Sequence, residues 1–434
     1  MIEWLGRLRV AGATDSDLMT VRYRTLGFLF VLMLITYLDR VCFSTTASAM
    51  SRELGLSLEQ IGLAGSCFVL GYVLFEIPGG WLADRFGARM MLTRIVIWWS
   101  AFTALTGVAW NLGSLVLIRF LFGCGEAGAF PGATSAIARW FPRMEFARAQ
   151  SIVMLGSRIG FAMTSWIVIA LMSTYGWRAV YWIFAVLGVI WAAGWGVWYR
   201  DLPEQHRSVR TDELALIRDQ RAEPASSSHF RWREILSNRS LLALCGMYSG
   251  YTWGLYFYIQ WLPTYLEQAR GLALPDVGPI AAAVLLSGAV ANVVGGWASD
   301  RLVTRFGLRS ARRIPAMTGL VAAGVLLALA ATLEDNTLAL ICLGTSFGSA
   351  ELILAVTWAT ALDMGGSAAG VVSGTMNSLG QVGGALAPWL IGMMVDRTGS
   401  WEVPLLVSAA YYVVSALLWL AIDPQRRVRM EHAD

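Results

Sequence analysis

Long apolar runs, separated by short polar connections, make up most of the 434-residue chain. The run IPAMTGLVAAGVLLALAATL at 314–333 is apolar on every side, whereas an amphipathic helix of a soluble protein would carry a single apolar stripe. Each run has about the 20 residues that an α-helix needs to cross the hydrocarbon core of a bilayer. The pattern therefore predicts an all-α, polytopic membrane protein that lies in a lipid bilayer.

Twelve such runs are predicted as transmembrane helices. They cover residues 25–48, 59–81, 92–111, 114–138, 149–173, 179–199, 241–265, 277–298, 314–333, 337–361, 369–394 and 403–422. One long polar segment separates the sixth run from the seventh and is predicted to be a linker. Within it, TDELALIRDQRAE is expected to form a short amphipathic helix that begins at Thr211. The predicted units are an N-terminal stretch, a six-helix bundle, the linker, a second six-helix bundle and a tail, at 1–24, 25–199, 200–240, 241–422 and 423–434.

Arginine residues gather in alternate connections between the runs. Clusters follow the second, fourth, sixth, eighth and twelfth runs, whereas the opposite connections hold only Arg52, Arg178, Arg270 and Arg397. Because cytoplasmic loops of membrane proteins carry an excess of basic residues, both termini and the linker are expected in the cytoplasm. The expected location is the cell membrane, in particular a bacterial inner membrane.

The composition narrows the function further. Of the residues of the chain, 56% are hydrophobic and only 14% are charged, whereas about a quarter of the residues of a soluble domain are charged. Its five cysteines all lie in predicted helices, without a CxxC pair, and it has three histidines. Neither a disulfide framework nor a metal site is therefore expected. The sequence has no nucleophile motif of the kind that enzymes carry, so we do not expect an enzyme. We further expect a monomer that does not bind nucleic acid.

One motif occurs in both halves of the chain. GGWLADRFGAR at 79–89 follows the second run, and GGWASDRLVTRFGLR at 295–309 follows the second run of the other half. Both read Gly-Gly-Trp-x-x-Asp-Arg and continue into a basic stretch. Adjacent glycines let helices approach closely, and an aspartate at a helix end can pair with a loop arginine or cap a neighbouring helix. The duplication predicts parallel structural repeats, a design found in transporters.

Five further stretches carry a family resemblance. They are YLDR (37–40), GYVLFEIPGGWLADRFG (71–87), RFLFGCGEAGAFPG (119–132), YFYIQWLPTYLEQARGL (256–272) and GVVSGTMNSLGQVGGALAP (370–388). In these stretches the chain resembles the major facilitator superfamily, and more narrowly its anion:cation symporter branch, which includes galactonate, glucarate, hexuronate and tartrate transporters. The resemblance implies the major facilitator fold, with twelve helices in two six-helix halves. It also implies that the duplicated motif is a gating motif, formed by Gly79, Gly80, Asp84, Arg85, Gly295, Gly296, Asp300 and Arg301.

Several ionisable residues lie inside the predicted helices. A charged side chain at the bilayer centre costs about 2.5–3.5 kcal/mol even on a lenient scale, so each requires a partner or an aqueous cavity. Arg119 and Glu126 are two helical turns apart, so both can point into the same interior. Arg40 is expected at a depth similar to that of Arg119, and together they would form a clamp for a carboxylate. The predicted substrate is therefore a small organic anion.

The resemblance assigns roles to these charges. It implies that Asp39 and Glu126 take part in proton coupling, and that Arg40 and Arg119 take part in anion binding or gating. Burial disfavours a carboxylate and a nearby arginine favours it, so either acid could change its protonation during a cycle. The alternative is that all four neutralise one another as structural ion pairs.

Other polar positions complete the predicted site. The resemblance suggests that Tyr37 and Tyr72 face the substrate, with aromatic packing as the alternative. Asn377 and Gln381 share a helix face and are candidates for substrate hydroxyls, with hydrogen bonding between helices as the rival interpretation. Ser157 is expected in the same polar cavity. Three accessory charges depart from the pattern of the branch, and either compensate one another or adapt the cavity to a different anion: Glu76, Arg158 and Glu351.

These observations favour a secondary active transporter. We predict uptake of a sugar acid or another hydroxylated carboxylate by alternating access, with the proton as coupling ion and no other cofactor. The alternatives are a proton-coupled exporter of drugs or metabolites and a membrane receptor without transport. Cationic drugs would match two cavity arginines poorly.

Overall fold

The computed structural model describes residues 21–142, 145–219, 237–365 and 369–426, and they are almost entirely helical. The first half contains α2 (Val21–Leu54), α3 (Leu58–Phe86), α4 (Ala88–Thr106), α5 (Leu112–Glu126), α6 (Ala129–Trp140) and α7 (Phe146–Trp198). The linker contains α8 (Thr211–Asp219). The second half contains α10 (Arg239–Tyr256), the π-helical turn η4 (Phe257–Trp261), α11 (Leu262–Gln268), α12 (Leu274–Thr332), α13 (Asn336–Gly365), α14 (Ala369–Thr398) and α15 (Glu402–Leu418).

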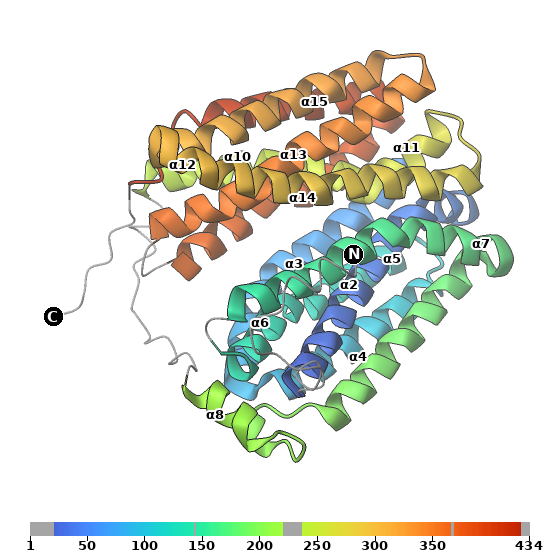
Figure 1. Cartoon of the computed structure of the whole chain (residues 1–434). Helices are drawn as coiled ribbons and strands as arrows, with labels where there is room; N and C mark the ends of the chain where they lie inside the picture. The colour runs from blue at the N-terminus through green and yellow to red at the C-terminus, as the bar shows by residue number, and fades with distance from the viewer. Residues whose placement is uncertain (1–20, 143–144, 220–236, 366–368, 427–434) are drawn as a thin grey trace.

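All twelve predicted runs are helical, in two halves of six (Figure 1). Helix α7 contains the fifth and sixth runs and bends at Gly176, and α12 contains the eighth and ninth runs and bends at Gly307. The fourth run is divided between α5 and α6, and the seventh among α10, η4 and α11. Of the described helical stretches, eight are long and apolar enough to cross a membrane by a strict criterion, and Glu402–Leu418 is a shorter apolar helix. The predicted all-α membrane fold is confirmed.

Predicted and observed helix ends differ where polar residues stay helical. Helix α2 continues to Leu54, six residues past its predicted end at 48, because a helix need not end where its apolar face ends. The third helix begins at Ala88 rather than at 92, directly after Gly87. Parts of the predicted N-terminal stretch, linker and tail, at 1–20, 220–236 and 427–434, lie outside the described residues.

The duplicated motif ends in the same turn in both halves. Gly87, directly after Phe86 at the end of α3, separates α3 from α4, and Phe306 and Gly307 stand at the bend of α12. The two glycines have φ values of 86° and 73°, a region that residues with a Cβ rarely adopt. The sequence repeat therefore corresponds to a repeated change of chain direction after the second helix of each half.

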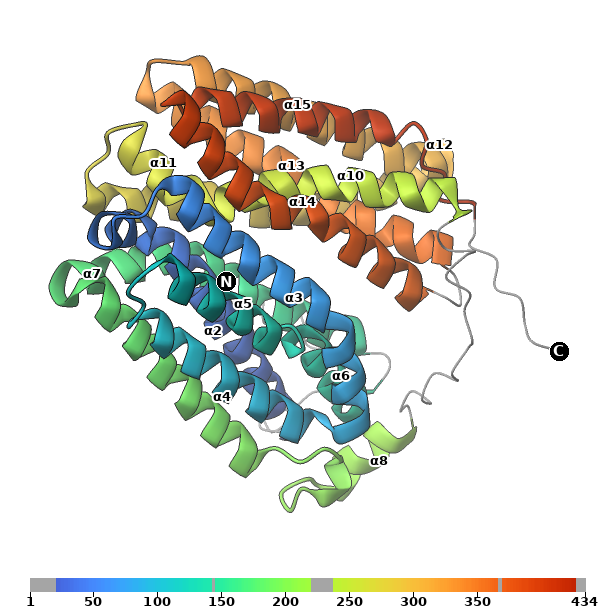
Figure 2. The same ribbon diagram turned by 180° about the vertical axis from the view of Figure 1, so that it is seen from behind.

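The two halves meet along one seam. Helix α3 packs along α14, and α7 packs along α12. The end of the molecule where α2 begins and α15 ends is called the linker end here, and the opposite end, where α2 gives way to α3, is called the far end. In both views the halves touch toward the far end and diverge toward α6 and α8 (Figures 1 and 2).

Backbone contact closes the seam between α3 and α14. A Cβ placed on Gly62 would lie 2.0 Å from the carbonyl oxygen of Pro388, and one on Gly392 would lie 2.3 Å from that of Leu58. Asp396 accepts hydrogen bonds from the backbone N–H groups of Leu58 (3.2 Å) and Glu59 (2.6 Å) at the start of α3. These N–H groups have no partner within their own helix, so the aspartate of one half caps a helix of the other.

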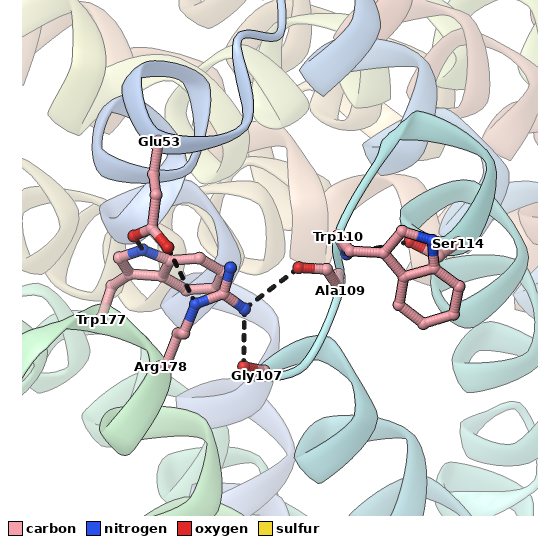
Figure 3. A network of polar contacts seen from close by, with 7 residues as sticks. All are labelled: Glu53, Gly107, Ala109, Trp110, Ser114, Trp177 and Arg178. Atoms are coloured by element: carbon pink, nitrogen blue, oxygen red, sulfur yellow. Dashed lines mark hydrogen bonds and ion pairs between the residues drawn. The ribbon is translucent and has the colours of Figure 1, made fainter.

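A second network ties together the far end of the first half (Figure 3). Arg178, which follows the bend of α7, donates to Glu53 at 3.0 Å and to the carbonyl oxygens of Gly107 (2.9 Å) and Ala109 (3.0 Å). The indole N–H of Trp177 donates to the same glutamate at 2.6 Å. The end of α2, the turn after α4 and the bend of α7 are therefore joined, and the first half is braced where it meets the second.

Candidate functional site

The first group of buried charges lies between α2 and α5. Arg40 donates from Nε to the carboxylate of Glu126, whose side chain is fully buried. The Arg40 guanidinium also lies 4.6 Å from the ring centre of Tyr72 and 5.3 Å from that of Tyr37. Among the described residues, Arg40 Nη2 and the second oxygen of Glu126 have no hydrogen-bond partner. The contact is therefore made through one donor rather than through the two-pronged geometry available to arginine.

Arg119 lies deeper in the first half. Its guanidinium is surrounded by the rings of Phe43 (4.3 Å), Phe68 (4.7 Å) and Phe122 (4.9 Å), and the residue is only 2% exposed. A cation over aromatic faces is stabilised by their negative charge density. Arg40 also lies over the Phe68 ring, at 5.5 Å, but of these two arginines only Arg40 lies over the rings of Tyr37 and Tyr72.

Asp39 has its charged neighbours, Glu126 and Arg119, within the first half. It is 3% exposed, and neither of its carboxylate oxygens has a hydrogen-bond partner among the residues that the structure describes. Asp39 and Glu126 both interact electrostatically with Arg119. The two acids and Arg119 therefore form one buried electrostatic group inside the first half.

The second group of charges joins the two halves. Arg158 of α7 and Glu351 of α13 form an ion pair, with Nη2 and Oε2 3.3 Å apart. The hydroxyl of Tyr251 on α10 donates to the other oxygen of Glu351 at 2.6 Å. Glu351 is fully buried, while about a quarter of the Arg158 side chain, 27%, is exposed. Two of the three accessory charges are thus each other's partners across the seam.

A third polar contact crosses the seam between α3 and α14. Asn377 donates from Nδ2 to both oxygens of Glu76, at 3.2 Å each. Gln381, one turn further along α14, has a buried side-chain oxygen without a partner in the described part of the chain. The predicted pair of amides therefore stands at the seam, with Asn377 engaged by an acid.

The remaining predicted positions are placed as follows. Tyr37 is half-buried and packs against Phe161 with ring centres 5.9 Å apart, and Tyr72 is buried beside Arg40. Ser157 is buried, and its hydroxyl donates to the carbonyl oxygen of Met154 in its own helix at 2.6 Å. Ser157 thus contributes a hydroxyl whose proton is already engaged.

The glycines of the duplicated motif bring helices into close contact. A Cβ on Gly79 would lie 2.8 Å from the Cα of Gly128, at the break between α5 and α6, and one on Gly295 would lie 2.1 Å from the carbonyl oxygen of Leu352. Arg85 and Arg301 are exposed. The side chains at Asp84 and Asp300, and positions Gly80 and Gly296, lie outside the described residues. The described glycines therefore act as packing positions, each in its own half.

Sequence reasoning missed Tyr251. The stretch YTWGLYFY at 251–258 contains three tyrosines and one tryptophan. Neither a nearby charge nor the spacing in the sequence distinguishes the tyrosine that reaches Glu351 from the residues that only pack. The same holds for Phe43, Phe68 and Phe122 around Arg119, which read as ordinary apolar residues. Only the packing of α2, α3 and α5 turns them into a cage.

Two helical bundles that share a repeated motif, with charges at the seam between them, are an architecture typical of secondary transporters. The family model described as the Major Facilitator Superfamily matches residues 29–388, and the chain belongs to this superfamily. It is a multi-pass membrane transporter rather than an enzyme.

Curated relatives cover nearly the whole chain. A probable sulfoacetate transporter from Cupriavidus necator is 35% identical over 406 residues, which are 93% of this chain and 94% of the relative. A probable galactarate/D-glucarate transporter from Bacillus subtilis is 29% identical, over 94% of this chain and 93% of the relative. Among solved structures, a bacterial homologue of the human lysosomal transporter Spinster, inward-facing and unoccupied, matches with a TM-score of 0.77 at 19% identity, covering 92% of this chain and 96% of that one. The last likeness concerns the fold alone.

Proposed function

We propose that the protein is a proton-coupled transporter that takes up a small organic anion across the cell membrane by alternating access. The observation that carries the proposal is the contact of Arg40 with the buried Glu126, beside the tyrosines at the seam. The relatives named for sulfoacetate and for galactarate/D-glucarate support an anionic substrate. A guanidinium keeps its charge under all conditions and matches carboxylate and sulfonate geometry.

The coupling follows from charge balance at Glu126. While Glu126 is ionised, it neutralises Arg40 and competes with a substrate anion. Once a proton binds to Glu126, Arg40 is released and can hold the anion with its free donors. Loss of the proton restores the contact of Arg40 with Glu126 and expels the anion. Asp39 is proposed as a second proton site, and Arg119, enclosed by rings, as the fixed charge that balances both acids.

The seam offers groups for the rest of the substrate. Tyr72, Asn377 and Gln381 are proposed to bind its hydroxyl or carbonyl oxygens, and Tyr37 to line the site. Asn377 would leave Glu76 when substrate arrives, because a neutral amide loses little by exchanging one acceptor for another. The substrate class is a hydroxylated carboxylate such as a sugar acid, or a short sulfonate.

The orientation in the membrane follows the arginine distribution. The linker end, which carries most arginines outside the predicted helices, is proposed to face the cytoplasm. The far end is closed by the contacts of Asp396 and by an ion pair of 2.9 Å between Arg52 and Glu267. The conformation described here would then be open toward the cytoplasm.

Transport by the purified chain in proteoliposomes tests the proposal. With an acidic exterior, uptake of labelled D-glucarate or sulfoacetate is expected. Glu126→Gln should abolish gradient-driven uptake and keep counterflow exchange, because the glutamine cannot release a proton but still frees Arg40. Glu334→Gln, an exposed acid at the far end, is the matched control. Loss of exchange as well as uptake in a folded Glu126→Gln protein would assign this residue a structural role. Transport of the anion only in the outward direction would favour a proton-coupled exporter. Binding of the anion without transport would favour a membrane receptor.

A further inference from the structure

We propose that Arg158 is a second anion-binding residue, held in the empty transporter by Glu351, and that the transported anion carries two acidic groups, one for Arg40 and one for Arg158. The inference rests on the proposed function and adds the charge of the substrate to it. Four observations carry it.

The first observation is how incompletely Arg158 is bonded. An arginine offers five N–H donors, yet among the residues that the structure describes the partner found for Arg158 is Glu351, at 3.3 Å. Within the described part of the chain, the facing oxygen of Glu351 has no hydrogen bond of good geometry, so the contact is ionic rather than a two-pronged bond. About a quarter of the arginine side chain, 27%, is exposed. Arg158 therefore has donors available for another anion.

The second observation is that Glu351 is held by more contacts than Arg158. Glu351 is fully buried and anchored by Tyr251 at 2.6 Å. A Cβ on Gly288 of α12 would lie only 2.8 Å from the Cγ of Glu351, so α12 packs directly against this side chain. When the pair separates, the long and partly exposed arginine is the partner that can move.

The third observation is that Arg158 and Arg40 face the same part of the seam. Tyr37 interacts electrostatically with both arginines, and its ring centre lies 5.3 Å from the Arg40 guanidinium. Tyr37 also packs on Phe161, three residues after Arg158 in α7. Phe161 in turn meets Phe347 of the other half, with ring centres 6.3 Å apart. A continuous row of rings therefore links the surroundings of the two arginines across the seam.

The fourth observation is that each arginine holds one buried carboxylate, Glu126 for Arg40 and Glu351 for Arg158. Removing a partner from a buried charge is costly, so an arginine leaves its carboxylate readily only when another anion replaces it. Two such stand-in carboxylates match a substrate with two acidic groups. Because Arg158 and Glu351 belong to different halves, exchange of Glu351 for substrate also releases a tie between the halves.

The test compares anions that differ in one acidic group. Uptake and binding of the dianions D-glucarate and sulfoacetate would be compared with those of the monoanions D-gluconate and acetate. Each anion would be measured with the wild-type protein and with Arg158→Gln. The control variant is Arg397→Gln, which changes an exposed arginine at the far end. Arg158→Gln should weaken the binding of the dianions by about tenfold or more while changing that of the monoanions little, because only the dianions engage the second guanidinium. Arg40→Gln should weaken both kinds of anion.

Two further variants guard against misfolding. Arg158→Gln combined with Glu351→Gln removes both charges of this pair, so neither is left without its partner, and it should show the same selective loss of dianion binding. Glu351→Gln alone should tighten dianion binding severalfold, since Arg158 no longer has a competing anion. The inference would be overturned if a folded Arg158→Gln protein lost binding of dianions and monoanions equally, or lost neither. Failure of the wild-type protein to transport any of these anions would instead count against the proposed function.

Discussion

Arg119 shows how one buried charge depends on its surroundings. Its guanidinium is stacked among three phenylalanine rings and interacts electrostatically with Asp39 and Glu126. From spacing alone, Arg119 and Glu126 are predicted to share a face that lines the path. In the structure the rings of Phe43 and Phe68 come from α2 and α3, and they enclose Arg119. The role that follows from this geometry is charge balance.

Replacing Arg119 by glutamine should therefore destabilise the protein strongly. Asp39 would lose its balancing charge and Glu126 one of its two basic neighbours, and breaking a buried ionic group in this way costs about 3–5 kcal/mol. Thermal unfolding in detergent measures the loss. Adding Asp39→Asn to Arg119→Gln should recover part of it, because one uncompensated acid is then removed. Strictly additive losses in the double variant would contradict the electrostatic coupling of these two residues.

At the scale of elements, the linker is docked onto the first half. Glu213 of α8 is buried, and its carboxylate accepts hydrogen bonds from the backbone N–H groups of Val21 (3.4 Å) and Arg22 (3.1 Å), the first two residues of α2. His206 packs edge-on against Trp140 (5.8 Å) and Trp198 (5.0 Å). The linker helix predicted at Thr211 is present, and its acid supplies the negative charge that a helix N-terminus favours.

Docking of the linker should weaken in acid. Burial, and then the nearby charge of Arg200, lower the pKa of His206 below its ordinary value of 6.5. Above that value the imidazole is neutral in both docked and released states. Below it the released state binds more protons, so stability of the docked linker falls as the pH drops through about 6.5.

Hydrogen exchange of peptides from 200–219 measures this effect. Wild type and His206→Gln would be compared at each pH, so that the intrinsic pH dependence of exchange cancels. Wild type should lose protection relative to the variant between about pH 7.5 and pH 5.5. A difference between the two proteins that does not change with pH would show that His206 does not titrate in the docking step.

At the scale of the whole molecule, the halves are held together near the far end. Asp396 caps α3 of the other half, Arg52 pairs with Glu267, and the backbones touch at Gly62 and Gly392. Exchange between conformations requires these contacts to break as a group. Their strength therefore sets how often the far end opens.

Asp396→Ala should shift the transporter toward conformations with an open far end. Loss of a charged cap at a helix N-terminus costs about 1 kcal/mol, which changes a two-state population severalfold. Spin labels at Trp110 and Leu338, exposed far-end positions in different halves, would report a larger share of long distances. Asp276→Ala, an exposed acid in the first turn of α12, is the control. Unchanged label distances would show that Asp396 does not hold the far end closed.

Hydrophobic patterning by itself determined the twelve helices and their division at the polar linker, and the duplicated motif indicated the repeat, because apolar runs of membrane length and duplicated motifs are local properties. It also picked out every charge at the candidate site, since an ionisable residue is conspicuous in an apolar run. Tertiary structure alone decided the partners: Arg40 with Glu126, Arg158 with Glu351, Asn377 with Glu76. Each of these contacts joins helices far apart in the sequence, and side-chain direction and depth depend on how those helices pack. The enclosure of Arg119 and the part of Tyr251 follow from the same packing, because a ring or hydroxyl acquires its role only from the charge placed against it.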